Sequence, residues 1–361
     1  MSTREQLDLV VTQRLDEYAA AVTAPDAPEV ALPRGIEIID AEFTPDALGM
    51  KVIFTGTRDD GKVATFETGS FLDNGGVEDA SDRHDICVST AGGCTKACRF
   101  CSVPYSELGF ERLLTAEELV VQTIYTILER NREATMPNAL GFMGNGEPPD
   151  NAAVILAVCY LAGKPELNIE RVTFSTIGEN IAGIGKMARS FAQLDMRTIM
   201  QFSLHAADEA KRRSIIPGRK PLDKILEAID GYGEVTGEPV KLNVVLMDGI
   251  DEFEGFTNAS PEDARMLAQT LTAPSAVSGN PIRRLLKLSA YNSVPGIPFE
   301  PASPAAVEAF VATLAEYGIT DIQRFRGSGI EIDEQKTIGG FACGQLRTTT
   351  PNALTKVHRR K

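Results

Sequence analysis

Apolar and polar residues along this chain of 361 residues follow two different periods, and each period predicts one kind of element. Short apolar runs predict seven strands, namely "DICVST", "ALGFMG", "RVTFST", "RTIMQFSL", "VKLNVVLM", "LLKLSAYN" and "TDIQRF". Amphipathic stretches between them predict helices, and "TAEELVVQTIYTILER" is the clearest because Thr115 and Glu118 form a capping box at its start. Alternating strands and helices favour parallel strands covered by helices. The pattern therefore predicts an α/β fold, either an incomplete β/α barrel of about six units or an open doubly wound sheet.

The region before residue 84 has a different pattern. Residues 7–23 predict one amphipathic helix, which a Pro/Ala-rich linker follows. The segments "GMKVIFTG" and "KVATFET" flank "TRDDG", and the Asp-Gly pair predicts a hairpin turn. We therefore expect a helix and linker over 1–34, a small β element over 35–83, a barrel core over 84–350 and a basic tail over 351–361.

The net charge, the length of the apolar runs and the cysteines limit which classes of protein this chain can belong to. The net charge of −14 counts against a simple RNA-binding protein, although basic stretches occur at Lys211–Arg213, Gly218–Lys220, Arg283–Arg284 and in the tail "KVHRRK". Each stretch is either a solvated surface patch or a contact for a polyanion. No run of 18 apolar residues is present, so we expect no membrane span. Six cysteines without a signal-peptide core predict reduced thiols and a cytoplasmic location.

Three of the six cysteines, Cys94, Cys98 and Cys101, lie in the segment "CTKACRFC". A zinc site would need a fourth ligand, and a thioredoxin-like pair would not need Cys94. The spacing, with Phe100 before the last cysteine, is the signature of radical S-adenosylmethionine (SAM) enzymes. In such enzymes three thiolates hold a [4Fe–4S] cluster and leave one iron open for SAM. The segment follows a predicted strand, so we expect it at the carboxyl-terminal mouth of a barrel.

Polar residues follow the other predicted strands at the same end. A SAM site is predicted at Gly146 and Glu147 in "GNGEP", Ser175 in "FSTIG", Ser203, Leu204 and His205 in "FSLHA", and Asn292 in "SAYN". Each of these alone is more typical of a cap or turn, and His205 is equally a structural histidine. Their shared position at one rim favours a cofactor site. Cys159, inside an apolar helix, is predicted to be a packed core thiol.

The ordered motifs also carry a family resemblance. "CVSTAGGCTKACRFC", "GNGEP", "FSTIG", "FSLHA", "RRSIIP", "AYN" followed by "PGIPF", and "FACGQL" cover roughly residues 62–347, and on them the chain resembles the RlmN/Cfr-type class A radical SAM methyltransferases. The resemblance implies a partial (β/α)6 radical SAM barrel, a [4Fe–4S] cluster and two SAM molecules per turnover. An electron donor such as flavodoxin or ferredoxin is also implied.

The resemblance further implies roles for three residues. Cys343 in "ACGQL" would accept a methyl group from the first SAM, and the methyl carbon would then be added to an sp2 carbon of adenine. Cys87 would form a disulfide with Cys343 and release the product. Glu67 in "FETGSF" resembles the family's general base, and a surface glutamate on a hairpin is the alternative.

The chain departs from the family where substrates are recognised. The N-terminal RNA-binding domain is reduced to one predicted helix, the segment "SGIEIDEQKTIGGFA" before Cys343 is lengthened, and Asn243 replaces an acidic residue. Three hypotheses follow. The protein methylates adenine in RNA, or it methylates a small molecule, nucleotide or peptide, or it is an iron–sulfur protein without methyl transfer. Cys87 and Cys343 argue against the last hypothesis.

Overall fold

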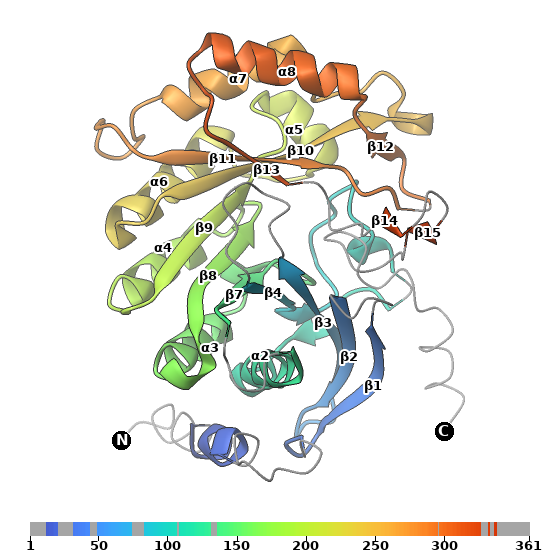
Figure 1. The fold of residues 1–361 in the computed structure, drawn as a ribbon, viewed down its shortest axis with the longest axis vertical. Helices are drawn as coiled ribbons and strands as arrows, with labels where there is room; N and C mark the ends of the chain where they lie inside the picture. Colours follow the sequence, from blue (N-terminus) through green and yellow to red (C-terminus); the bar gives the residue numbers. More distant parts are fainter. Residues whose placement is uncertain are drawn as a thin grey trace.

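The computed structural model describes residues 12–20, 32–43, 49–73, 83–106, 108–130, 136–294, 296–325, 331–332 and 336–337 (Figure 1). Its main sheet has 11 strands, in the order β1-β2-β3-β4-β7-β8-β9-β10-β11-β13, with β12 paired to β10. The strands are β1 (Ile36–Phe43), β2 (Gly49–Thr57), β3 (Val63–Asp73), β4 (Arg83–Val88), β7 (Asn138–Phe142), β8 (Ile169–Thr176), β9 (Arg197–Ser203), β10 (Val240–Gly249), β11 (Arg284–Ala290), β12 (Phe299–Pro301) and β13 (Ile322–Phe325). Two small separate sheets pair β5 (Ala91–Gly92) with β6 (Arg112–Leu113), and β14 (Glu331–Ile332) with β15 (Lys336–Thr337).

The strands β4, β7, β8, β9, β10, β11 and β13 run parallel, and each is hydrogen-bonded to the next in chain order. The connecting helices are α2 (Ala116–Arg130), α3 (Ala153–Ala162), α4 (Ile181–Phe191), α5 (Glu209–Ile215), α6 (Leu222–Thr236), α7 (Pro261–Thr272) and α8 (Pro304–Glu316). They lie along the outer side of the curved sheet (Figure 1). A doubly wound sheet would reverse its strand order and carry helices on both faces. The predicted partial barrel is therefore confirmed, with β13 as a seventh parallel strand.

Alternation along each strand separates the helix-covered face from the inner face. On β8, Val172 and Phe174 are fully buried in the apolar core, while Thr173 and Ser175 point the other way. The rings of Phe142, Phe174 and Phe191 stack with centroid separations of 5.3 and 4.9 Å, which joins β7, β8 and α4. The polar residues of the strands are thus left for the inside of the barrel.

The predicted hairpin is also confirmed. β2 and β3 pair antiparallel from Gly49 opposite Phe71 to Thr57 opposite Val63, and β3 pairs with β4. The β element that precedes the barrel therefore continues the barrel sheet. The separate domain bounds at 35–83 and 84–350 stay a prediction.

Helix predictions have mixed outcomes. The capping box of α2 is present, since the Thr115 amide donates to Glu118 at 2.8 Å and the Glu118 amide donates to Thr115 Oγ1 at 3.2 Å. Residues 12–20 of the predicted N-terminal helix are helical, and the tail 351–361 lies outside the described residues.

The prediction for Cys159 is wrong, because α3 buries Val154, Ala157, Val158 and Leu161 and leaves Cys159 exposed on its opposite face. Within the described ranges, no helix has the length and apolarity that crossing a bilayer requires.

Candidate active site

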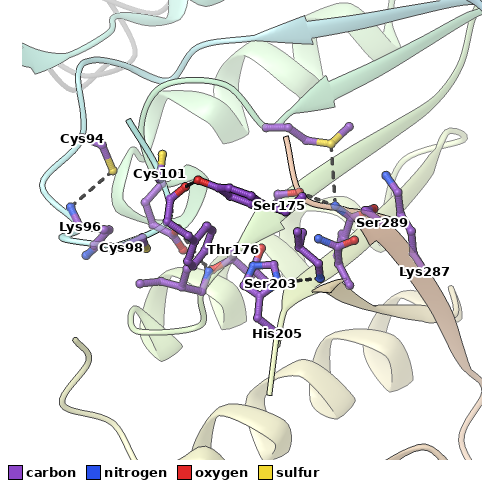
Figure 2. A pocket seen from close by; sticks show the side chains of 18 of the residues that line it. Cys94, Lys96, Cys98, Cys101, Ser175, Thr176, Ser203, His205, Lys287 and Ser289 are labelled. Atoms are coloured by element: carbon purple, nitrogen blue, oxygen red, sulfur yellow. Dashed lines mark hydrogen bonds between the residues drawn. The ribbon is translucent and has the colours of Figure 1, made fainter. Parts of the chain in front are cut away.

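A cavity opens at the carboxyl ends of the parallel strands. Its lining includes nine of the predicted site residues, namely Cys94, Cys98, Cys101, Gly146, Glu147, Ser175, Ser203, His205 and Asn292. Figure 2 shows the three cysteines on one side, Ser289 and Lys287 on the other, and Ser175 and Ser203 between them. The fold thus brings together residues that are up to 198 positions apart, from Cys94 to Asn292. This arrangement fits a ligand that spans the mouth of the barrel.

The cysteine loop is held by backbone bonds to itself and to α5. The amide of Cys101 donates to the Cys98 carbonyl at 3.2 Å, and the amide of Arg99 donates to the Ile215 carbonyl at 2.9 Å. The amide of Lys96 donates to Cys94 Sγ at 3.4 Å, while Lys96 Nζ pairs with Asp150 at 2.7 Å. These bonds fix the loop without using the thiols of Cys98 and Cys101.

The donor set fits an iron–sulfur cluster. Burial raises the pKa of Cys94, and it raises that of Cys98 well above the usual thiol value, with the negative charges of Cys101 and Cys94 acting in the same direction. The three sulfurs therefore lie close enough to repel each other as thiolates, and a cationic iron centre removes that repulsion. In the part of the chain described, no three His, Cys, Asp or Glu side chains form a single-ion metal site. The fit rests on three thiols that share one wall of the cavity.

Glu147 faces the cysteines from the loop after β7. It accepts hydrogen bonds from the Thr176 hydroxyl and from the Ile177 amide at 3.3 Å, so β8 sets its orientation. Burial raises the pKa of Glu147 to about 7, although these hydrogen bonds act in the opposite direction. Its neighbour Gly146 has φ of +101°, and a Cβ there would lie 2.3 Å from Thr90 Oγ1. The loop therefore requires glycine to bring its backbone to the cavity.

His205 is a buried neutral histidine that packs on the cysteine loop. Its ring contacts Phe100 edge-on with centroids 4.7 Å apart, and its Nδ1 accepts from the Val245 amide at 3.1 Å. Burial, and to a lesser extent the charge of Arg212, lowers the pKa of His205 to about 3. The residue has φ of +56°, an uncommon conformation outside glycine. His205 thus has structural contacts and also lines the cavity.

Arg212 of α5 forms hydrogen bonds with two of the predicted SAM segments. Its guanidinium donates to the carbonyls of Ile177 at 2.8 Å, Ser203 at 3.2 Å and Leu204 at 3.2 Å. The side chain is 2% exposed and its Cζ lies 5.0 Å from the centroid of the Phe202 ring. Burial lowers the pKa of Arg212 to about 10, which leaves it charged at neutral pH. One cation therefore sets the spacing between the ends of β8 and β9.

The other predicted site residues that the structure describes are absent from the cavity lining. The Leu204 side chain is fully buried in the helix-side core, and only its backbone takes part, with the amide bonded to Asn243 O at 3.0 Å. Cys87 lies on β4 between Gly69 of β3 and Gly141 of β7, and is partly buried. Cys343 lies outside the described residues. The roles assigned to these three residues stay predictions.

Glu67 is buried, so the alternative of a surface glutamate is wrong. It is 1% exposed, and its carboxylate lies 3.2 Å from Lys51 Nζ, which is equally buried. Asn145 of the "GNGEP" loop donates to Glu67 Oε1 at 3.4 Å. The hairpin β2–β3 therefore contacts the loop that carries Glu147, although Glu67 itself does not line the cavity.

Several lining residues were missed from the sequence, namely Lys96, Thr176, Ile177, Gln201, Lys287, Ser289 and Tyr291. Gln201 precedes Ser203 by two positions on β9, and Ser289 follows Lys287 by two on β11. Strand alternation places such pairs on one face. Applying that rule inward from Ser203 would have found Gln201, whereas Lys96 and Ile177 lie in loops, where no strand period applies.

The basic stretch at Lys211–Arg213 is mostly engaged within the protein. Lys211 pairs with Asp263 at 2.5 Å, and Arg213 pairs with Glu209 at 2.6 Å. Arg212 is the buried cation described above. A phosphate at this stretch would have to compete with two carboxylates.

Comparisons with known proteins agree with this geometry. The Radical SAM superfamily matches residues 88–255. A relative from Syntrophomonas wolfei, "Probable dual-specificity RNA methyltransferase RlmN", is 32% identical over 281 residues, which cover 75% of this chain and 70% of that protein. The protein of the same name from Heliobacterium modesticaldum is 35% identical over 74% of this chain and 63% of its own length. The crystal structure of a radical SAM methyltransferase from Sphaerobacter thermophilus matches with a TM-score of 0.67 and 28% identity, over 86% of this chain and 81% of that one.

Proposed function

This chain belongs to the RlmN/Cfr-type family of radical SAM methyltransferases, and we propose that it methylates an sp2 carbon of adenine in RNA through a methyl-cysteine at Cys343. The family implies a [4Fe–4S] cluster and SAM as cofactors. The proposal adds the acceptor, the carrier thiol and the consumption of two SAM molecules per turnover.

One observation carries the proposal. Cys94, Cys98 and Cys101 share one wall of a cavity whose other walls are built by Glu147, Ser203 and further polar strand ends. Glu147 presents a carboxylate for the ammonium group of SAM, and Ser203 presents a hydroxyl for a ribose. An iron–sulfur protein without methyl transfer would not need this second set of polar groups.

In the proposed reaction each thiol has one task. The Cys343 thiolate attacks the methyl carbon of one SAM and becomes a thioether, and S-adenosylhomocysteine leaves. A [4Fe–4S] cluster held by Cys94, Cys98 and Cys101 would, when bound and reduced, supply the electron for cleavage of a second SAM to a 5′-deoxyadenosyl radical, and the methyl group carried on Cys343 would give up a hydrogen atom to that radical. The methylene radical on Cys343 would then add to the adenine carbon, and the adduct would lose its ring proton to Glu67 and one electron, which returns to the oxidised cluster. The Cys87 thiolate would attack the Cys343 sulfur, the S–CH2 bond would break as the disulfide forms, and the methylene carbon would take up a proton to become the methyl group of the released base.

Glu67 is proposed as the base that takes the proton from the adenine carbon. Its carboxylate is paired with Lys51 at 3.2 Å, and both side chains are buried. The contact with Asn145 links Glu67 to the "GNGEP" loop at 3.4 Å. A base held by such contacts would keep its position as the acceptor enters.

A small molecule, nucleotide or peptide is the second candidate acceptor. The net charge of −14 and the internal pairing of Lys211 and Arg213 support it, because both reduce the attraction of a polyphosphate. The first candidate is supported by the printed names of the relatives, which are RNA methyltransferases.

The test is label transfer under anaerobic conditions. The reconstituted protein is incubated with a reductant, SAM labelled in its methyl group, and either ribosomal RNA, transfer RNA or free adenine nucleotides. Label at an adenine carbon of RNA supports the proposal, and label only in a small acceptor refutes RNA as the substrate. Cys343→Ser should abolish transfer, and Cys159→Ser is its matched control because Cys159 is exposed on α3 and does not line the cavity. Retained transfer by the Cys343 variant would refute the carrier thiol.

A further inference from the structure

The cavity wall across from the cysteines contains a buried amide that the proposed chemistry does not use. Asn243 lies on β10 and lines the cavity. Its neighbours Leu242 and Val244 pack in the helix-side core, so strand alternation turns Asn243 and Val245 inward. The Asn243 side chain is 9% exposed, and its Oδ1 has no hydrogen-bond partner among the described residues. A buried amide oxygen without a partner is unfavourable, and because Asn243 lines the cavity, a ligand bound there can supply the missing donor.

The surroundings of Asn243 define what such a ligand must offer. In the sheet register Asn243 lies opposite Ser203 on β9 and opposite Lys287 on β11, and both of these also line the cavity. Figure 2 shows Lys287 beside Ser289, across the cavity from the cysteines. An amide and an ammonium group therefore lie on neighbouring strands. The amide alone offers one acceptor and one donor, so a ligand that fits it presents an N–H group beside a lone pair.

We propose that Asn243 is a specificity-determining residue for the methyl acceptor, with its amide bonded to a purine edge that carries an amino group beside a ring nitrogen. Oδ1 accepts from the amino group and Nδ2 donates to the ring nitrogen, which is the two-bond match of an asparagine to adenine. This inference rests on the proposed function, and it adds how the acceptor base is selected. The adenosyl group of SAM has the same edge, so the test has one arm for each source.

The first arm measures base selection on the full, reconstituted chain. Two RNA hairpins contain the segment labelled in the transfer experiment, one with adenosine at the target and one with purine riboside, which lacks the amino group. Wild-type protein should methylate the purine riboside RNA with a kcat/KM about tenfold lower. Asn243→Leu should be about tenfold slower on adenosine and should not distinguish the two RNAs.

The second arm measures the dissociation constant of SAM under the same anaerobic conditions, and Asn243→Leu should leave it within about twofold. Asn138→Leu is the matched control, because Asn138 on β7 is also buried, its Oδ1 has no partner among the described residues, and it does not line the cavity. That variant should keep the wild-type discrimination. Asn243→Asp has the same shape and serves as the second variant if Asn243→Leu does not fold. It keeps an acceptor for the amino group, lacks the donor to the ring nitrogen, and should also be about tenfold slower on adenosine.

Two results would overturn the inference alone. One is Asn243→Leu that keeps the wild-type preference for adenosine over purine riboside, or Asn243→Asp that keeps the wild-type rate on adenosine. The other is a variant that binds SAM about tenfold more weakly, which would assign the amide to the adenosyl group instead. Wild-type protein that methylates neither hairpin would refute the proposed function, and the inference would fail with it.

Discussion

Replacing Arg212 should damage stability and SAM binding together. Arg212→Met keeps an unbranched side chain over the Phe202 ring but removes every donor to the carbonyls of Ile177, Ser203 and Leu204. At about 1.5 kcal/mol for each hydrogen bond to a charged group, the three bonds amount to about 4–5 kcal/mol. The two strand ends that they join carry predicted SAM contacts, so we also expect a SAM dissociation constant at least about tenfold higher.

The matched control is a second buried arginine that lies away from the cavity. Arg284 pairs with Asp230 at 2.7 Å, the two side chains are 3% and 0% exposed, and neither lines the cavity. Arg284→Met leaves a buried carboxylate without its cation, so it should cost a similar amount, about 3–5 kcal/mol. It should leave SAM affinity unchanged.

Urea unfolding of the reconstituted proteins measures the free energy of unfolding, and anaerobic equilibrium binding measures SAM affinity. Arg212→Lys keeps a charge that reaches fewer acceptors and should fall between wild type and Arg212→Met. A loss below about 1 kcal/mol in Arg212→Met would show that the three bonds contribute little. Equal weakening of SAM binding in Arg212→Met and Arg284→Met would show that global destabilisation, and not the local clamp, is the cause.

Three further predictions concern other buried groups. Because the pKa of His205 is lowered to about 3, the unfolded histidine binds more protons below pH 6.5, so the contribution of His205 to the free energy of unfolding should fall by about 2 kcal/mol from pH 7 to pH 5. Glu147, whose pKa is raised to about 7, takes up a proton in the folded state over the same range and acts in the opposite direction, so the measurement is the difference between urea titrations of wild type and of His205→Gln, which lacks the histidine component. Lys51→Met should cost about 3–5 kcal/mol because it removes the ammonium from the buried Glu67 carboxylate, and the double variant with Glu67→Gln should recover part of this loss in the same titrations. Gly146→Ala should abolish SAM binding, since its Cβ would lie 2.3 Å from Thr90 Oγ1, whereas Gly61→Ala, which also has positive φ but open space, should cost stability only at its hairpin.

The barrel could be predicted from the sequence because the patterns that indicate its strands and helices are local. Each parallel strand is a short apolar run, and α2 begins at a capping box that Thr115 and Glu118 form in the structure. The strand-end residues of the site were predictable for the same reason, since parallel strands bring their carboxyl ends to one rim. Ser175 and Ser203 needed only a correct strand boundary.

The remaining site residues depend on contacts that no local pattern encodes. Arg212 has its role because α5 places it beside the carbonyls at the ends of β8 and β9. The motif "RRSIIP" does not indicate which of its arginines is buried. The burial of Glu67 depends on Lys51 from the paired strand. Cys159 was assigned to the core because α3 is apolar on most of its surface, so the pattern could not identify the exposed face.

The pairing of Lys211 with Asp263 and of Arg213 with Glu209 has a consequence for how this surface responds to salt. A lysine or arginine that stays paired with a carboxylate neutralises no phosphate. Few of the counterions condensed on a nucleic acid are therefore released when it binds at this surface, and the gain in entropy is small. Recognition through this face would then depend on shape and base contacts, and its affinity would change only slightly with ionic strength. In a chain with a net charge of −14, such neutral surface segments let an anionic partner approach without strong repulsion.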